Sequence, residues 1–129
     1  QAVVLACEDG ARLYPLTQDY PAALLPVLNK PLLYYQLELL EKAGYTEVLV
    51  VCSFAETHVA HVSKFEAHVA EFKEAFTGAL NIDLVVLSGS LETAEVLRQV
   101  SDRIRCDFLL LPGDLVCEQV LTDLAEVSV

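Results

Sequence analysis

In "AVVLACEDGARLYPLT", residues 2–17, an apolar run leads directly into a loop containing glycine, arginine and proline, and this pattern is the strongest indication of the fold class. Residues 2–6 are all apolar, without the alternation of a half-exposed strand, which is typical of a strand buried on both faces of a parallel sheet. In such sheets, ligands bind beyond the carboxyl ends of the strands. The loop that begins at residue 7 is therefore the first candidate for a functional site.

The rest of the chain alternates short β-rich runs with longer segments of helical periodicity. Strands are predicted at residues 2–6, 47–53, 82–88 and within 107–114, and helices at 31–43, 56–77, 92–104 and from 117 onward. This alternation predicts an α/β domain with a mostly parallel sheet flanked by helices and right-handed crossovers. The loops that follow the strands then share one edge of the sheet, and they are residues 7–30, 53–57, 88–92 and 112–117.

Helical spacing also predicts which side chains face the sheet, and the segment 56–77 is compatible with one helix or with two. The inward residues are expected to be Leu33, Leu37 and Leu40 in the first helix, Val59, Val62, Val69, Phe72 and Phe76 in the second, and Ala94, Leu97 and Val100 in the third. Gly44 is expected to end the first helix, because glycine adopts the positive φ common after a helix.

Size and charge limit the possible function classes. With 129 residues, of which 54% are hydrophobic, the chain has the size and composition of one globular domain. Its formal net charge of −11 argues against nucleic acid or an anionic membrane as a direct partner, because both require a basic surface. No apolar run approaches the ~20 residues that cross a bilayer.

The chain ends and the cysteines predict a fragment of a cytosolic protein. A strand begins almost at the first residue without a basic leader, and a helical pattern near residue 127 stops abruptly, so residues 1–129 are expected to be one domain or part of one from a longer chain. The four cysteines lack CxxC or zinc-ligand spacing and fit a reducing compartment; they are Cys7, Cys52, Cys106 and Cys117.

Two loops carry residues suited to phosphate chemistry. Gly10 and Arg12 follow the first strand, where backbone N–H groups and a guanidinium suit anionic phosphate oxygens. Gly113 and Asp114 follow the fourth strand, where a carboxylate is suited to Mg²⁺ that bridges phosphates. Because parallel strands end at the same edge, these two loops make a nucleotide site there one interpretation. The alternative is that Arg12 forms an ordinary surface ion pair and that "PGD", residues 112–114, is a common turn.

The order of these motifs resembles the opening of the sugar-phosphate nucleotidyltransferases. The matching segments are "QAVVLA", "GARLYPLT", "ALLPVLNKPLLYYQLELLEKAGYTEVLVV", "ETAEVLRQV" and "DFLLLPGDLV". The resemblance implies the amino-terminal part of a Rossmann-like nucleotidyltransferase fold of the GT-A type. It also implies that Gly10, Arg12 and Gly113 stand where active members bind the triphosphate, and Asp114 where they bind Mg²⁺.

The sequence departs from the family pattern at four positions. Cys7 and Glu8 replace the two leading glycines of the loop, Ala22 replaces the lysine of the Pro-Lys motif, and Glu92 replaces the glycine of Gly-Thr-Ala. A side chain at residues 7 and 8 hinders close backbone approach, and a glutamate repels a triphosphate. The site is therefore expected to be degenerate, without catalytic residues or a cofactor.

Among families with such losses, the chain resembles the gamma subunits of the guanine-nucleotide exchange factor for translation initiation factor two. The resemblance implies a non-catalytic subunit that acts through protein contacts. Its implied partners are the epsilon-like catalytic subunit, the other subunits of the factor, and the initiation-factor GTPase. The alternative is an active sugar-1-phosphate nucleotidyltransferase that uses Mg²⁺ and a nucleoside triphosphate, or the regulatory subunit of one.

Other candidate residues are interpreted as structural. His58 and His61 lie one helical turn apart near Glu56, but a third convergent ligand is missing, so a polar helix surface is the preferred interpretation. Tyr34 and Tyr35 suit either base stacking or packing at an interface, and the sequence does not separate these roles.

Overall fold

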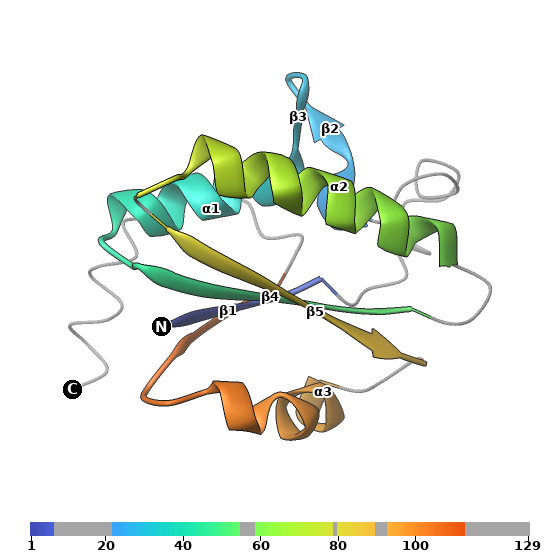
Figure 1. The fold of residues 1–129 in the computed structure, drawn as a ribbon, viewed down its shortest axis with the longest axis vertical. Coiled ribbons are helices and arrows are strands. Elements are labelled where there is room, and N and C mark those ends of the chain that lie inside the picture. Colours follow the sequence, from blue (N-terminus) through green and yellow to red (C-terminus); the bar gives the residue numbers. More distant parts are fainter. Residues whose placement is uncertain (7–21, 55–58, 79, 90–92, 113–129) are drawn as a thin grey trace.

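A computed structural model of the chain describes residues 1–6, 22–54, 59–78, 80–89 and 93–112 (Figure 1). Four parallel strands form its central sheet in the order β5-β4-β1-β6. The strands are β1 (Ala2–Leu5), β4 (Glu47–Phe54), β5 (Asn81–Ser88) and β6 (Leu109–Pro112). Each is rich in Val, Leu or Ile, and the central strand β1 is almost fully buried, as expected for a strand covered on both faces, whereas the edge strands β5 and β6 are partly exposed.

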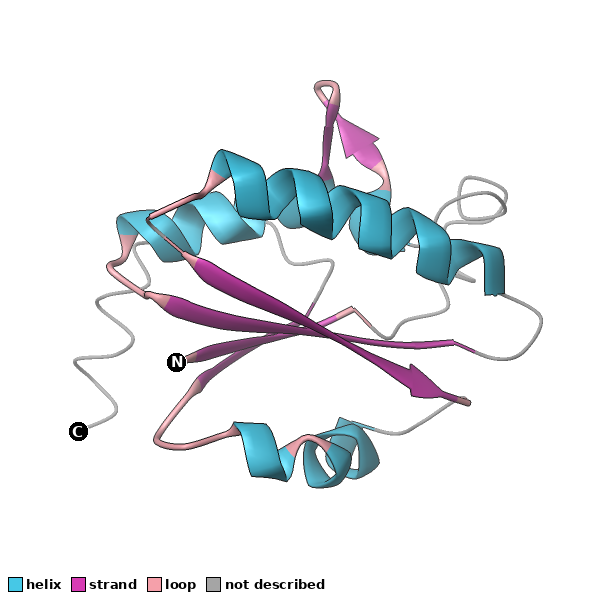
Figure 2. Ribbon diagram, viewed as in Figure 1, coloured by secondary structure: helices cyan, strands magenta, loops and turns pink. Residues whose placement is uncertain are grey.

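Helices cover both faces of the sheet, which gives three layers (Figure 2). On one face lie α1 (Leu32–Lys42) and α2 (Val59–Ala75), and on the other lie α3 (Thr93–Gln99) and the 3₁₀ turn η4 (Ser101–Arg103). None of the helices in the described part of the chain has the length and apolar character needed to cross a membrane.

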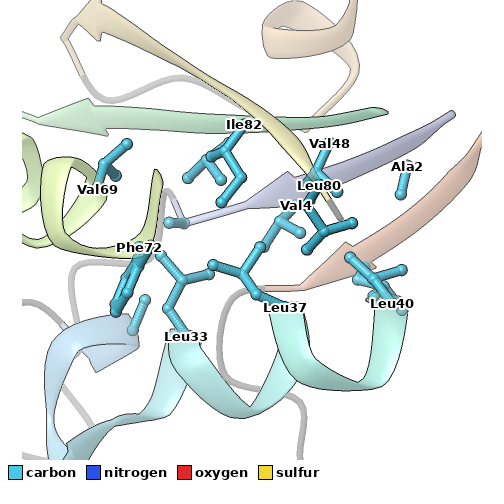
Figure 3. Close-up of a cluster of buried hydrophobic side chains, with 14 of the residues drawn as sticks. Ala2, Val4, Leu33, Leu37, Leu40, Val48, Val69, Phe72, Leu80 and Ile82 are labelled. Atoms are coloured by element: carbon cyan, nitrogen blue, oxygen red, sulfur yellow. The ribbon is translucent and has the colours of Figure 1, made fainter. Parts of the chain in front are cut away.

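The α1–α2 face of the sheet holds the larger core. Figure 3 shows Leu33, Leu37 and Leu40 of α1 in one row, directed at the strands. The buried residues of this core are Ala2, Val4, Ala6, Ala23, Leu24, Leu33, Leu37, Leu40, Val48, Val50, Cys52, Phe65, Val69, Phe72, Phe76, Leu80, Ile82 and Leu111. The α3 face holds a smaller core of Val3, Leu49, Val51, Val96 and Val100.

The helix ends follow the residues that the sequence offers. Pro31 is the N-cap of α1, where its missing N–H is not required by the helix. Gly44 follows the helix with φ of 89°, a conformation that costs glycine little, and its N–H donates to the carbonyl oxygen of Glu41 at 3.1 Å. The predicted end of the first helix is confirmed.

The predicted α/β order and the parallel sheet are confirmed, and within the predicted segment 56–77 the described residues form one helix, α2. One detail of the predicted inward faces is wrong: Ala94 is exposed and Val96 is buried instead, whereas Val100 is buried as predicted. The fourth strand, predicted within residues 107–114, occupies Leu109–Pro112. The helix predicted from residue 117 lies outside the described residues.

A small hairpin was predicted as loop. It consists of the 3₁₀ turn η2 (Ala22–Leu24) followed by the antiparallel strands β2 (Pro26–Val27) and β3 (Lys30–Pro31). Figure 1 shows the hairpin projecting away from the sheet beyond the helices. Prolines at both ends of so short a motif conceal it from strand periodicity, since proline is rare in strands.

Candidate functional site

The carboxyl ends of β1 and β6 lie side by side and in register. Leu5 pairs with Pro112, the last residue of each strand, and Ala6 donates its N–H to the carbonyl oxygen of Val51 at 2.8 Å. The first predicted loop begins at residue 7, directly after Ala6, and the fourth, predicted as residues 112–117, begins at Pro112, the last residue of β6. The described strands therefore deliver both loops from adjacent positions at one edge of the sheet, as the predicted site requires.

Gln36 of α1 ties the helix to this edge. Its Nε2 atom donates a hydrogen bond to the carbonyl oxygen of Pro112 at 3.0 Å, and the residue is only 1% exposed. A buried hydrogen bond of this kind contributes about 1 kcal/mol net, and more is lost when one partner is left unpaired. The side chain thus fixes the last carbonyl of β6 directly before Gly113 in the sequence.

Ser53 provides a similar connection between β4 and β5. Its hydroxyl donates to the carbonyl oxygen of Gly89 at 2.6 Å, and Ser53 itself is buried. Gly89 has φ of 93°, which favours glycine at the point where the chain leaves β5. The ends of the two strands are therefore held together by a side chain in addition to the ladder of backbone hydrogen bonds.

Sequence reasoning did not identify Gln36 and Ser53, although a signal was present for one of them. Gln36 shares a helix face with Leu33, Leu37 and Leu40, and a polar residue at an inward position needs a buried partner. Ser53 gave no such signal, because serine at the end of a strand is common in ordinary turns.

The predicted phosphate and metal residues lie almost entirely outside the described residues. These are Gly10, Arg12, Gly113 and Asp114, together with the degenerate positions Cys7, Glu8 and Glu92. Of Ala22 the backbone is described, and it begins the turn η2. The predicted roles of these residues remain predictions. Among the residues that are described, no three His, Cys, Asp or Glu side chains come together in a way that suits a metal.

The tyrosines at the start of α1 support the hairpin. The Tyr35 hydroxyl donates to the carbonyl oxygen of Val27 at 2.6 Å, and the Lys30 ammonium lies 4.3 Å from the centroid of the Tyr34 ring. Tyr34 in turn packs against Phe76, with ring centroids 5.4 Å apart. Both tyrosines therefore make contacts within the chain itself, and their two predicted roles, base stacking and packing at an interface, stay predictions.

A polar hollow of about 350 Å³ lies at the opposite edge of the sheet, where the strands begin. Carboxylates and guanidinium groups both line it, together with amide and apolar side chains. The lining residues are Gln1, Glu47, Val48, Leu49, Asn81, Asp83, Asp102, Arg103 and Arg105. Ligands of parallel sheets bind at the carboxyl edge, so this hollow is not the predicted site.

Comparison with known proteins places the chain in a family. Residues 1–128 match the family described as "Nucleotidyl transferase". The chain is 33% identical over 126 residues to translation initiation factor eIF2B subunit gamma of Dictyostelium discoideum, covering 92% of the chain and 27% of that protein. It is also similar to the epsilon subunit of Schizosaccharomyces pombe eIF2B, at 32% identity over 95% of the chain and 18% of the relative.

The family likeness extends to an enzyme and to solved structures. Mannose-1-phosphate guanyltransferase of Neurospora crassa is 30% identical over 97% of the chain and 33% of its own length. The solved structure of a protein named "putative glucose-1-phosphate thymidylyltransferase" from Bacillus anthracis aligns with a TM-score of 0.77 at 22% identity, covering 99% of this chain and 49% of that one. The chain spans about a quarter of the length of the gamma subunits that it matches.

Proposed function

This chain belongs to the nucleotidyl transferase family, and on that premise we propose that it is part of a non-catalytic subunit of a guanine-nucleotide exchange factor. In this role the chain resembles the gamma subunit of eIF2B. The exchange factor of which it is part restores GTP to a translation-initiation GTPase in the cytosol. The proposal covers the whole protein, of which residues 1–129 supply the amino-terminal part of the nucleotidyltransferase-like domain.

The observation that carries the proposal is the contrast between an intact frame and an altered loop. The frame is complete where it is described, with Leu5 and Pro112 in register and Gln36 bonded to the end of β6. The loop sequence, however, has Glu8 in place of a glycine, and Ala22 in place of a lysine. Two unit charges about 4 Å apart interact by roughly 4 kcal/mol at an effective dielectric constant near 20. Loss of the lysine charge and gain of a glutamate charge therefore both weaken the binding of a triphosphate.

The proposed mechanism works through protein contacts. Exchange is accelerated when the factor binds the nucleotide-free GTPase more tightly than the nucleotide-bound form, which shifts the population toward release. No acid–base residue is needed in this chain for such a role. We assign the GTPase contact to an epsilon-type partner subunit, and the present chain supplies a scaffold on which that partner assembles, without a cofactor.

A second function is favoured by specific residues. Gly10, Arg12 and Asp114 match the family pattern, and the Neurospora crassa guanyltransferase is among the relatives. Under this alternative the protein transfers a nucleotidyl group to a sugar 1-phosphate with Mg²⁺ and releases pyrophosphate, or regulates an enzyme that does so.

One experiment separates the two functions. The full-length protein is incubated with nucleoside triphosphates, Mg²⁺ and sugar 1-phosphates, and pyrophosphate release is followed. We expect no release above background, because the loop lacks the lysine and two glycines. Release that disappears in Asp114→Ala but persists in Asp102→Ala, an exposed aspartate at the opposite edge of the sheet, would establish the enzyme instead.

A further inference from the structure

The hairpin β2–β3 presents an apolar tip to solvent. Leu28 is 87% exposed, more than any other large apolar side chain in the described ranges, and its neighbour Val27 is 45% exposed. The hairpin projects from the body of the domain, so the tip is convex and open (Figure 1). Such a tip is accessible to another molecule over most of its surface.

The conformation of Leu28 makes its presence there costly. Leu28 and Asn29 form the two-residue turn between the strands and have φ of 51° and 68°. Asparagine and glycine adopt such left-handed conformations readily, whereas leucine does not, because its Cβ crowds the backbone. Leu28 therefore gains little from burial within the described fold while it occupies an unfavourable turn position. Strained residues of this kind concentrate at binding and switch sites.

Contacts at the base hold the hairpin in place. The Tyr35 hydroxyl bonds to the Val27 carbonyl oxygen, Lys30 lies over the Tyr34 ring, and the Leu32 N–H donates to the Leu25 carbonyl oxygen at 3.0 Å. Tyr34 is anchored in turn on the aromatic core. The tip is thereby fixed before any partner arrives, which lowers the entropy that binding must overcome.

The prolines restrict how the hairpin is recognised. Pro26 and Pro31 face each other across the ladder, and neither has an N–H to donate. A partner strand therefore finds few donors along the edges of the hairpin, and strand addition is disfavoured. Recognition must come from the side chains at the tip.

Charge indicates the character of the partner. Residues 20–37 contain no aspartate or glutamate although the chain has 19 acidic residues, and Lys30 is the only charged residue in this stretch. A carboxylate on the partner is thus attracted by Lys30 at the hairpin. Elsewhere the same carboxylate is repelled by the acidic residues of a chain whose net charge is −11. A second copy fits poorly, because a convex tip cannot bury much area against itself and both copies are acidic.

We propose that the hairpin is a docking element, and that Leu28 inserts into an apolar pocket with carboxylates at its rim on another protein subunit. This inference rests on the proposed function, which makes the chain a scaffold subunit. Leu28 with Val27 supplies the apolar contact, and Lys30 pairs with the rim. Aromatic and aliphatic anchors that fill a pocket typically dominate the affinity of an interface.

The test uses the full-length protein and the epsilon-type subunit of the same organism, both purified, with the dissociation constant measured by titration. Leu28→Asn removes the apolar side chain and suits the positive φ, so it is expected to raise the dissociation constant at least about 10-fold, or about 1.4 kcal/mol, without lowering the Tm. Lys30→Ala is expected to weaken binding by about 2- to 5-fold and to reduce its dependence on salt.

Val86→Thr is the matched control, because Val86 is 40% exposed and belongs to β5 of the central sheet rather than to the hairpin. Its dissociation constant is expected to stay within about 2-fold of the wild type. Leu28→Gly provides a second variant that fits the same φ. The docking proposal is wrong if both Leu28 variants bind as tightly as the wild type, or if the Tm of both variants lies well below the Tm of the wild type. In either case the proposed function stands. If the wild-type protein itself does not bind, the scaffold function fails, and the docking proposal fails with it.

Discussion

The two faces of the central sheet are packed by different means. On the α1–α2 face, two long helices supply leucine and phenylalanine side chains to the core. Figure 3 shows this core from Val69 and Phe72 of α2 to Leu40 of α1. On the α3 face, a helix of seven residues and a 3₁₀ turn cover the strands mainly with Val96 and Val100. The same strands thus carry a large, aromatic-rich core on one side and a small valine core on the other.

This difference shows where the fold can position functional groups. Gln36, which fixes the end of β6, and the tyrosines that hold the hairpin all belong to α1, on the better-packed face. Precise positioning depends on side chains that are themselves held by packing. The α3 face supplies only a cover for the sheet in the described residues, and it is expected to respond less to truncation.

The largest effect is expected from Phe65→Ala. Phe65 is fully buried in the larger core, so its removal loses apolar burial and leaves a cavity. The free energy of unfolding should fall by about 3–5 kcal/mol, as measured by urea denaturation. The control is Glu66→Ala, an exposed neighbour on the same helix, which should change stability by less than about 0.5 kcal/mol.

A smaller loss is expected on the other face. Val96→Ala removes two methyl groups from the α3 core and should lower the free energy of unfolding by about 1.5–2.5 kcal/mol in the same denaturation experiment. Arg98→Ala, an exposed change on the same helix, serves as the control. If Val96→Ala destabilises the protein as much as Phe65→Ala does, the two faces do not differ as described.

Gln36→Leu sharpens the comparison at the edge that carries the predicted site. The substitution keeps the apolar volume but removes the donor to the Pro112 carbonyl oxygen, so a loss of about 1–1.5 kcal/mol is expected. Amide hydrogen exchange should accelerate in β6 more than in β5. Gln99→Leu, at an exposed position on α3, should leave both strands unchanged. Uniform acceleration across the sheet would argue against a local role for Gln36.

The smallest effect has the opposite sign. Leu28→Asn relieves the left-handed strain of the hairpin turn and should stabilise the protein by about 0.5–1 kcal/mol, or about 2–4 °C in Tm by calorimetry. Asn29→Leu is the reciprocal variant and should destabilise by a similar amount, because it places leucine at the other positive φ. A lower Tm for Leu28→Asn would show that the tip packs against the fold rather than facing solvent.

Much of the fold was predictable from local patterns. The continuous apolar runs predicted the strands β1, β4 and β5, and the spacing of Leu33, Leu37 and Leu40 predicted the buried face of α1, because both signals depend on the period of the backbone itself. The hairpin was not predictable in this way, since two-residue strands bounded by proline have no period. The sequence pattern predicts Val100 correctly in the third helix but selects Ala94 in place of Val96, because in seven helical residues the rotation about the helix axis is set by packing.

The candidate site shows the same difference between features that local sequence predicts and features that depend on tertiary contacts. Residue types after the strands could be read from the sequence alone, including Glu8 and Ala22 where the family pattern has glycine and lysine, because chemical identity is local. Only the tertiary structure decided that Leu5 lies beside Pro112, that Gln36 reaches the end of β6, and that Leu28 stands exposed at a strained turn. Register, partners and exposure depend on contacts between segments far apart in the chain, and no local pattern specifies them.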